Sequence, residues 1–378
     1  MLSSIAGDWD PIDLAYRKVS ICLLFHCHRS HFSVFYSIWN IYLDYHSACG
    51  RYAERTGQLP NIILQKRREN MLQEIQFPSF NQRDSIYAWL YVPACAHKGI
   101  IQLVHGYGEH SRRYLPMITA FMEEGYIVAA DDHVGHGKTA LENNSWGDWG
   151  SKGFHTMMED EHLLMEIVRK QYPDLPCFMF GHSMGSFIAR DFSARYGSEL
   201  AGAVYCGTAG PNDSLKEAVE QVKKIVDAGG GDGADPSLSS LLFASMNERY
   251  ENVKYGNEWV CEDPYVQLDH LQDPFNALTR PTNNRSLLYF MELMLSIGSI
   301  DWAAKVPSSL PILLISGDQD PVGGYGAGVY TVADWLWRTG HRPVTKLYTG
   351  YRHEIHNYPE LKKEVAEDIL AFIGAQLK

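Results

Sequence analysis

The sequence predicts an α/β fold in which a mostly parallel sheet is covered by helices on both faces. From about residue 73 onward, segments of strand length alternate with helical segments. Several of the strand segments are apolar throughout, which is typical of strands buried on both faces. The alternation stops between residues 211 and 300, where helical patterns follow one another without a strand. We therefore expect a single sheet with a helical insertion between two of its strands.

The first part of the expected sheet lies between residues 73 and 206. Residues 73–80 and 85–92 alternate in polarity around a turn, which predicts two paired strands. Further strands are predicted at residues 99–104, 126–130, 176–181 and 200–206. Helices are predicted between them at residues 114–124, 154–171 and 184–196. Gly125 is expected to end the first of these helices.

The insertion and the end of the chain complete the pattern. Within the insertion, helices are predicted at residues 215–226, 238–250 and 286–297, with a flexible Gly- and Asp-rich loop at residues 228–236. Strands at residues 310–316 and 344–348 and a helix at residues 361–376 follow. We expect one domain built from residues 71–210 and 301–378, with residues 211–300 as its helical cap or lid.

Residues 1–70 do not share this pattern and are expected to be an atypical N-terminal extension, either disordered or non-native. The cysteines and histidines of residues 22–31 lie close together, but their spacing matches no common zinc site. Residues 66–69 can be encoded by purine-only codons just ahead of Met71, as a mistranslated bacterial ribosome-binding site would be. A pyrimidine-rich gene sequence at that point would contradict the hypothesis of a non-native segment.

The composition argues against several classes of partner. The net charge is −12, and no run of Lys or Arg could follow a phosphate backbone, so nucleic acid is not an expected partner. No apolar run reaches the roughly 18 residues of a membrane-spanning helix, which leaves transient membrane contact through the cap. The seven cysteines are scattered and odd in number, which favours reduced thiols and a cytoplasmic location. The sequence implies neither a metal nor an organic cofactor.

The strongest chemical signal is Gly181-His182-Ser183-Met184-Gly185, which fits the pattern Gly-x-Ser-x-Gly. The motif stands between a predicted strand and a predicted helix, which is the context that a nucleophilic serine on a sharp turn requires. Only glycine allows neighbouring chain to approach such a turn closely. The helix that follows directs its N-terminal N–H groups toward developing negative charge. We therefore predict Ser183 as the catalytic nucleophile.

A serine hydroxyl is a poor nucleophile until a neighbouring base takes its proton. With this motif, the acid and the base follow the serine in chain order, each after a later strand. Asp320 and His353 stand just after predicted strands, so we predict His353 as the general base and Asp320 as the group that orients it. Asp318 and His356 are alternatives at neighbouring positions.

The turn at residues 105–108 follows a buried strand and is flanked by glycine. Such a turn can offer a backbone N–H to an oxyanion, and the predicted donors are the amides of Tyr107 and Met184. His105 is expected to be structural, and His136 is expected in a tight loop beside the site.

Taken together, these motifs resemble the monoglyceride lipase and lysophospholipase branch of the α/β-hydrolases, a group often placed with the serine aminopeptidases. The matching residues are His105-Gly106-Tyr107-Gly108-Glu109-His110-Ser111, Tyr114, Asp132-His133, Gly135-His136-Gly137, residues 181–185, Asp263-Pro264, Asp273-Pro274, residues 317–322 and Arg352-His353-Glu354. The resemblance covers about residue 73 to the end. It implies an α/β-hydrolase with a cap, acting on a lipid-like ester such as a monoacylglycerol or a lysophospholipid. It also implies the site roles given above. Val134 departs from the pattern, because the family usually has Arg there.

The cap offers the only indication of substrate. Its apolar residues would form a wall suited to an acyl chain, although most are equally explained as packing residues. They are Leu241, Leu242, Phe243, Met246, Phe275, Phe290, Met291, Met294 and Leu295.

Two other functions stay open. A proline-type aminopeptidase or amidase would use the same triad and would need an acidic cap residue to hold the substrate amine. Glu248, Glu251 or Glu262 could serve. A non-catalytic binding protein on the same scaffold typically lacks a member of the triad, whereas all three are present here.

Overall fold

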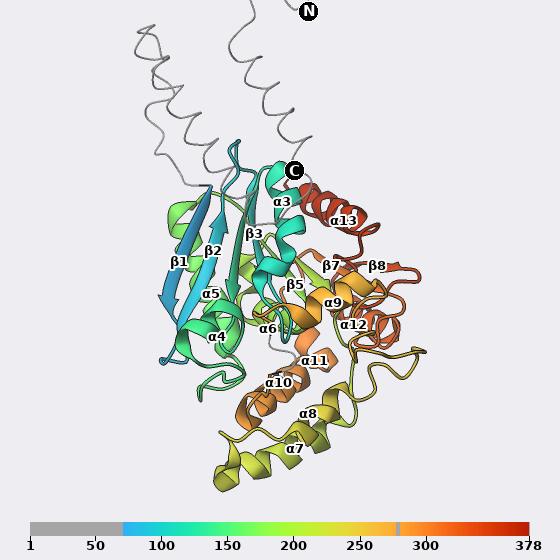
Figure 1. Ribbon diagram of the computed structural model, residues 1–378. Coiled ribbons are helices and arrows are strands. Elements are labelled where there is room, and N and C mark those ends of the chain that lie inside the picture. Colours follow the sequence, from blue (N-terminus) through green and yellow to red (C-terminus); the bar gives the residue numbers. More distant parts are fainter. Residues whose placement is uncertain (1–70, 277–279, 378) are drawn as a thin grey trace, which may run out of the picture. The chain divides into compact units, whose positions relative to one another are not determined.

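The computed structural model describes residues 71–276 and 280–377, without the side chains of residues 240 and 241. The segment of residues 1–70 lies outside the described residues, so the expectations about it stay predictions. The described strands are β1 (Leu72–Pro78), β2 (Ser85–Tyr91), β3 (Gly99–Val104), β4 (Tyr126–Asp132), β5 (Cys177–His182), β6 (Gly202–Cys206), β7 (Ile312–Gly317) and β8 (Val344–Tyr348). They form one sheet in the order β1-β2-β4-β3-β5-β6-β7-β8 (Figure 1).

The sheet is mostly parallel, as predicted. β1 pairs with β2 and β2 pairs with β4 in antiparallel fashion, and the remaining neighbours are parallel. A short turn joins β1 to β2, as an antiparallel pair allows, whereas parallel neighbours need a crossover connection. The predicted α/β-hydrolase class is therefore confirmed by the strand order and by the helices between the strands.

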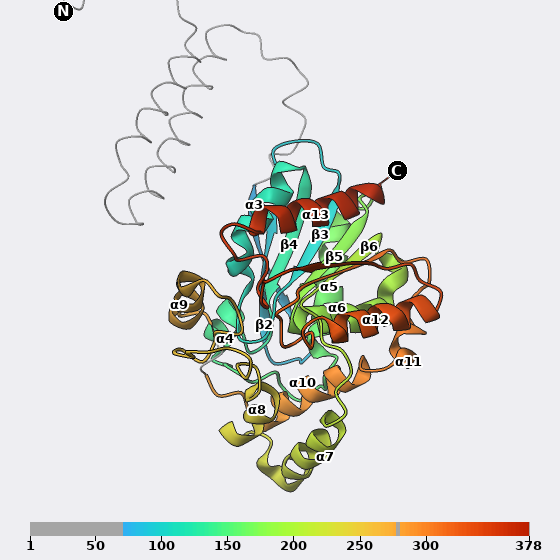
Figure 2. The same ribbon diagram turned by 90° about the vertical axis from the view of Figure 1, so that its right-hand side faces the viewer.

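Two apolar clusters cover the two faces of the sheet. Strand side chains alternate between them: in β5, Met179 joins one cluster, and Phe178 and Phe180 join the other. The helices on the first face are α5 (Thr156–Gln171), α6 (Met184–Tyr196) and α12 (Ala327–Arg338), and those on the second are α3 (Leu115–Glu123) and α13 (Lys362–Ala375) (Figure 2). Each buried phenylalanine stabilises this arrangement by about 1.5–3 kcal/mol relative to exposure.

The described residues between β6 and β7 include five α-helices. They are α7 (Leu215–Ile225), α8 (Pro236–Phe243), α9 (Pro264–Gln272), α10 (Asn284–Ser296) and α11 (Ile300–Ala303). Leu215, Val219 and Val222 recur at helical spacing on the buried side of α7, which packs on α10. α10 in turn packs on α6, and Figure 1 shows α7, α8 and α10 below the sheet.

The helix predicted at residues 238–250 was too long, because α8 ends at Phe243. The Asn247 side chain accepts the Trp259 N–H at 2.9 Å and donates to the Gly256 carbonyl at 2.8 Å. This residue therefore holds a loop together instead of continuing the helix.

The loop predicted at residues 228–236 begins later than expected. One further helical turn, Val226–Gly230, follows α7 and ends where Gly229 adopts a φ of 92°. A positive φ is readily adopted only by glycine, so this residue explains where the helical path stops.

Helices α4 (Gly137–Asn143), α9 and α12 were not predicted. α9 had a usable signal, because the Asp263 carboxylate accepts the N–H groups of Tyr265 and Val266 and Pro264 occupies the first turn. α12 is preceded by a glycine-rich stretch that indicates a loop.

Candidate active site

Ser183 stands on the sharp turn between β5 and α6. Its φ and ψ are 53° and −122°, a conformation that a non-glycine residue adopts only when its surroundings hold it there. A Cβ on Gly181 would lie 2.2 Å from the Gly185 carbonyl oxygen, and a Cβ on Gly185 would lie 2.1 Å from the Val104 carbonyl oxygen. Both positions therefore require glycine, for the steric reason expected from the motif.

Asp320 and His353 are hydrogen-bonded to each other. His353 Nδ1 lies 2.9 Å from Asp320 Oδ2, and both side chains are buried. The other Asp320 oxygen accepts the Val322 N–H at 2.9 Å, and the Ser316 hydroxyl donates to Oδ2 at 3.0 Å. These partners fix the carboxylate on one side of the imidazole ring.

The pKa values of the pair move in the directions that favour an Asp–His couple. Burial alone would raise the pKa of Asp320, but the His353 ring and the hydrogen bonds lower it below its usual value. Burial alone would lower the pKa of His353, but the Asp320 carboxylate raises it above 6.5. Nε2 of His353 has no hydrogen-bond partner among the described residues. With Nδ1 bonded to Asp320, Nε2 is the ring atom that can accept a proton.

The two alternative residues have other surroundings. Asp318 accepts the Gly350 N–H at 2.8 Å and thus fixes the neighbouring loop. His356 is buried against Tyr114, with ring centroids 4.7 Å apart, and burial lowers its pKa to about 3. Neither lines the cavity described next, so the structure brings His353, and not His356, next to the space above Ser183.

A cavity of about 630 Å³ contains both Ser183 and His353 in its lining. One part of its wall is apolar and comes from the insertion and α6, with Phe187, Leu242, Phe243, Met246, Phe290 and Met294. Another part is polar and includes Glu109, His182, His270 and Glu354. The cavity therefore has the size and the two-sided character of a site for a small amphipathic molecule.

The prediction of an apolar wall for the acyl chain is correct for only some of the residues named. Leu242, Phe243, Met246, Phe290 and Met294 line the cavity. Met291 is fully buried in the core, and Phe275 stacks on the Arg112 guanidinium, 4.3 Å from ring centroid to Cζ. Leu295 is exposed, and the side chain of Leu241 lies outside the described residues.

The loop after β3 passes directly beside Ser183. A Cβ on Gly106 would lie only 3.1 Å from the Ser183 Cβ, so the Gly106–Tyr107 peptide borders the nucleophile. The Tyr107 ring is fixed between Phe243 and Phe290, each 5.2 Å away between centroids, and its hydroxyl contacts Thr282 at 2.5 Å. The Tyr107 amide and the first amide of α6, that of Met184, are thus both next to the Ser183 side chain.

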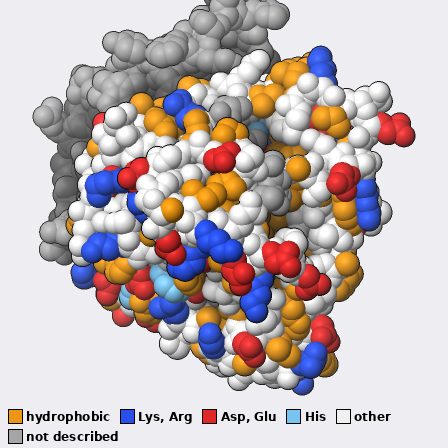
Figure 3. Space-filling view, turned by 90° about the horizontal axis from the view of Figure 1, so that it is seen from below, with side chains coloured by type: hydrophobic (Ala, Val, Ile, Leu, Met, Phe, Trp, Pro, Cys, Tyr) orange, Lys and Arg blue, Asp and Glu red, His pale blue; other side chains and the backbone are white. Residues whose placement is uncertain are grey.

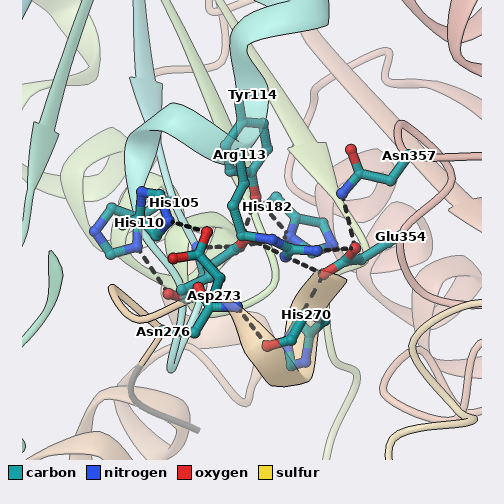
Figure 4. Close-up of polar contacts among 12 residues, drawn as sticks. His105, His110, Arg113, Tyr114, His182, His270, Asp273, Asn276, Glu354 and Asn357 are labelled. Atoms are coloured by element: carbon teal, nitrogen blue, oxygen red, sulfur yellow. Dashed lines mark hydrogen bonds and ion pairs between the residues drawn. The ribbon is translucent and has the colours of Figure 1, made fainter. Parts of the chain in front are cut away.

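A buried charged network, which includes two residues of the cavity lining, was not predicted (Figure 4). Arg113 contacts Glu354 at 2.5 and 2.9 Å and Glu109 at 2.9 Å. Glu109 also accepts hydrogen bonds from the Gly106 N–H at 2.6 Å and the Tyr114 hydroxyl at 2.6 Å. Burial would raise the pKa of Glu354, but Arg113 lowers it to about 2. Glu109 and Arg113 are four positions apart in the sequence, whereas their partner Glu354 is distant.

The end of α9 is attached to this network. His110 Nε2 lies 2.8 Å from an Asp273 carboxylate oxygen, and His270 Nε2 lies 4.0 Å from Glu354 (Figure 4). Burial lowers the pKa of His270 to about 4, so it presents a neutral ring to the cavity.

Two buried groups among the described residues bring three ligand-type atoms within 4.8 Å of one another. One group is His182, Cys206 and His356, and the other is Asp131, His133 and Glu161. His182 already bonds the Tyr114 hydroxyl at 2.8 Å, and His133 lies 3.1 Å from Asp131.

The chain belongs to the α/β-hydrolase family described as serine aminopeptidase, S33, whose sequence profile matches residues 96–360. Among curated proteins, it is 35% identical to the human monoglyceride lipase over 293 residues, which is 76% of this chain and 86% of that protein. It is 27% identical to the monoacylglycerol lipase of Mycolicibacterium smegmatis over 292 residues, or 76% of this chain and 92% of that protein.

A solved structure is more similar in sequence to the chain than these two lipases are. The thermostable carboxyl esterase of Bacillus coagulans, crystallised with glycerol, is 51% identical with a TM-score of 0.81 and covers 82% of this chain and 100% of its own. The chain is thus a hydrolase similar to monoglyceride lipases and carboxyl esterases. Within the described part of the chain, none of the helices has the length and apolar character needed to cross a bilayer.

Proposed function

We propose that this chain is a serine esterase that hydrolyses a neutral monoacylglycerol-like lipid ester through Ser183, His353 and Asp320. The observation that carries the proposal is the single cavity in which a serine on a strained turn and an Asp-bound histidine both meet an apolar wall. The similarity to monoglyceride lipases and to a carboxyl esterase supports the same reaction class.

The geometry supports an acyl-enzyme mechanism. Ser183 Oγ attacks the ester carbonyl while His353 Nε2 takes its proton, and Asp320 stabilises the imidazolium that forms. The Tyr107 and Met184 amides bind the oxyanion of the tetrahedral intermediate. His353 then gives its proton to the departing alcohol, which leaves the acyl group on Ser183. Water, activated by His353, attacks the acyl-enzyme and releases the fatty acid.

The charges of the lining favour a neutral head group over a phosphate. The described lining contains Glu109, Asp213 and Glu354, and no Lys or Arg is among its residues. A lysophospholipid phosphate would therefore enter without a cation to pair with, at a cost in binding free energy. The hydroxyls of a glycerol ester can instead hydrogen-bond with the polar part of the wall. We accordingly place monoacylglycerol ahead of lysophospholipid.

The aminopeptidase alternative has less support. None of Glu248, Glu251 and Glu262 is in the cavity lining, so the acidic group expected for a substrate amine is not supplied by them. Glu109 and Glu354 do line the cavity, but both carboxylates are paired with Arg113.

We also propose that residues 211–300 act as a cap over a domain of residues 71–210 and 301–378. Val253, Tyr265 and Leu295 are exposed apolar side chains of this segment. Figure 3 shows hydrophobic side chains scattered among charged ones on the face seen from below. The four described cysteines are free, which supports a reducing, cytoplasmic location.

The test is a substrate comparison with the full chain and its Ser183→Ala variant. We expect fatty-acid release from monooleoylglycerol with a kcat/KM at least roughly tenfold above that for lysophosphatidic acid, equivalent to about 1.4 kcal/mol. A prolyl amide should be cleaved more slowly still. Equal or faster cleavage of the anionic lipid would refute the head-group argument, and preferred cleavage of the amide would refute the esterase assignment.

A further inference from the structure

Three titratable side chains are buried outside the cavity and have no part in the reaction described above. Asp131 lies near the end of β4, His133 follows this strand, and Glu161 lies on α5. His133 Nδ1 is 3.1 Å from Asp131 Oδ1 and 3.5 Å from Glu161 Oε1, and all three side chains are 0% exposed. Such a concentration of charge inside a protein is costly unless the groups compensate one another.

The protonation of the group provides that compensation. Burial would lower the pKa of His133, but the Asp131 carboxylate raises it above its usual value. Burial, and next the Asp131 carboxylate, raise the pKa of Glu161 well above its usual value. These shifts favour a cationic His133 ring and a neutral Glu161 carboxyl. Gln102 also contacts Glu161, with its amide 2.8 Å from the Glu161 carbonyl.

His133 is joined to His105 by three contacts. Its Nε2–H donates to the His105 carbonyl at 3.2 Å, its backbone N–H donates to His105 Nε2 at 3.0 Å, and the two rings stack with centroids 3.8 Å apart. Burial, and next the charge of His133, lower the pKa of His105 well below its usual value. His105 is therefore neutral. Because its Nε2 accepts a hydrogen bond, its one ring proton is on Nδ1.

The Nδ1 proton of His105 forms a hydrogen bond to the loop beside Ser183. His105 Nδ1–H donates to the Gly106 carbonyl oxygen at 2.8 Å. The Gly106 carbonyl and the Tyr107 N–H belong to the same planar peptide, so holding the oxygen also fixes the direction of the N–H. On the preceding peptide, the Gly106 N–H donates to Glu109.

We propose that Asp131, His133 and Glu161 form a positioning cluster that, through His105, directs the Tyr107 amide toward the oxyanion. The proposal rests on the proposed esterase function, in which that amide is a donor. None of the three side chains touches the substrate. Their loss is expected to lower kcat, because the orientation of the Tyr107 N–H matters most when negative charge develops on the carbonyl oxygen.

A pair of His133 variants tests the step that links the cluster to His105. The side-chain amide of His133→Gln can place an N–H where Nε2–H stands, whereas the amide of His133→Asn reaches only the position of Nδ1. We expect His133→Asn to lower kcat on a p-nitrophenyl ester by roughly 10- to 100-fold with KM changed less than about threefold, below the loss for a whole oxyanion donor. His133→Gln should restore kcat to within about threefold of the original protein. His162→Asn, on α5 but away from the loop, should leave kcat unchanged.

Thermal unfolding of each variant separates a loss of amide positioning from a loss of folded protein. Equal kcat in the Gln and Asn variants overturns the proposal, as does a loss of kcat that follows only the loss of folded protein. If His133→Asn does not fold, His105→Asn, which keeps an N–H at the Nδ1 position, is compared with His105→Gln. The Asn variant should then be the more active, and equal activity overturns the proposal. Ester hydrolysis that persists in Ser183→Ala would instead refute the underlying function.

Discussion

Replacing Arg113 by methionine should destabilise the protein strongly, because the guanidinium is the only described cation between two buried carboxylates of the site. Arg113, Glu109 and Glu354 each have side chains only 3% exposed, with contacts of 2.5 to 2.9 Å. Removing one partner of a buried ion pair typically costs about 3–5 kcal/mol, because the remaining charge keeps its desolvation penalty. We expect a loss of that size in the free energy of unfolding at pH 7.

Urea unfolding followed by circular dichroism measures this loss, and its pH dependence gives a second check. The pKa of Glu354 is lowered from 4.5 to about 2, so its stabilising contribution is present above pH 4.5 and is lost as pH falls toward 2. Without Arg113 that contribution disappears, so the difference between the two proteins should narrow below about pH 4.5.

An exposed ion pair is the matched control. Lys363 lies 3.6 Å from Glu367 with side chains 84% and 63% exposed, and Lys363→Met should cost at most about 0.5 kcal/mol. Adding Glu109→Gln and Glu354→Gln to Arg113→Met should recover part of the stability, because no uncompensated charge then remains. A loss below about 1 kcal/mol for Arg113→Met, or a difference that does not change with pH, would refute this reasoning.

Four further predictions concern the site and its support. Asp320→Asn should lower kcat by about 10⁴-fold. In the unmodified protein, kcat/KM should fall as pH drops through a value above 6.5, because the raised pKa of His353 makes its ring cationic there and unable to accept the Ser183 proton. A pH–rate profile whose acidic limb has its midpoint at or below pH 6.5 would contradict this. Gly185→Ala should lower the free energy of unfolding in urea by more than about 3 kcal/mol, because its Cβ would lie 2.1 Å from a backbone oxygen. Gly374→Ala is the control: its Cβ would lie in open space on α13, and it should raise the free energy of unfolding by about 0.5–1 kcal/mol. Met294→Trp should reduce kcat/KM for long-chain esters more than for acetate esters, because Met294 lines the apolar wall, and equal reductions would place the acyl chain elsewhere.

Much of the fold and the central part of the site could be predicted because their signals are local. A strand, a Gly-x-Ser-x-Gly turn and a helix follow one another within a short stretch, and the need for glycine there is steric. Asp320 and His353 each follow a strand of the same sheet, and the resemblance to the family favoured them over Asp318 and His356. The parallel arrangement then brings the strand ends together, and the structure places the two residues 2.9 Å apart.

The parts that escaped prediction depend on contacts between distant segments. Arg113 and Glu354 are 241 positions apart, and nothing in either local sequence shows that they meet. The same holds for the apolar wall, where neighbouring residues such as Phe290 and Met291 have different roles. Phe290 lines the cavity and Met291 packs in the core, because adjacent positions on a helix point in different directions. The early end of α8 likewise depends on the hydrogen bonds that Asn247 makes to a later loop.

The measurement that tests the central claim most directly is covalent labelling of the full chain with a fluorophosphonate, followed by intact mass and peptide mapping. A serine activated by a histidine and placed beside an oxyanion site reacts with such a probe, whereas an ordinary serine does not. We predict a single adduct on Ser183, loss of esterase activity in step with labelling, and no adduct on a folded Ser183→Ala variant. An unlabelled active protein, or an adduct on another residue with activity retained in Ser183→Ala, would contradict the account.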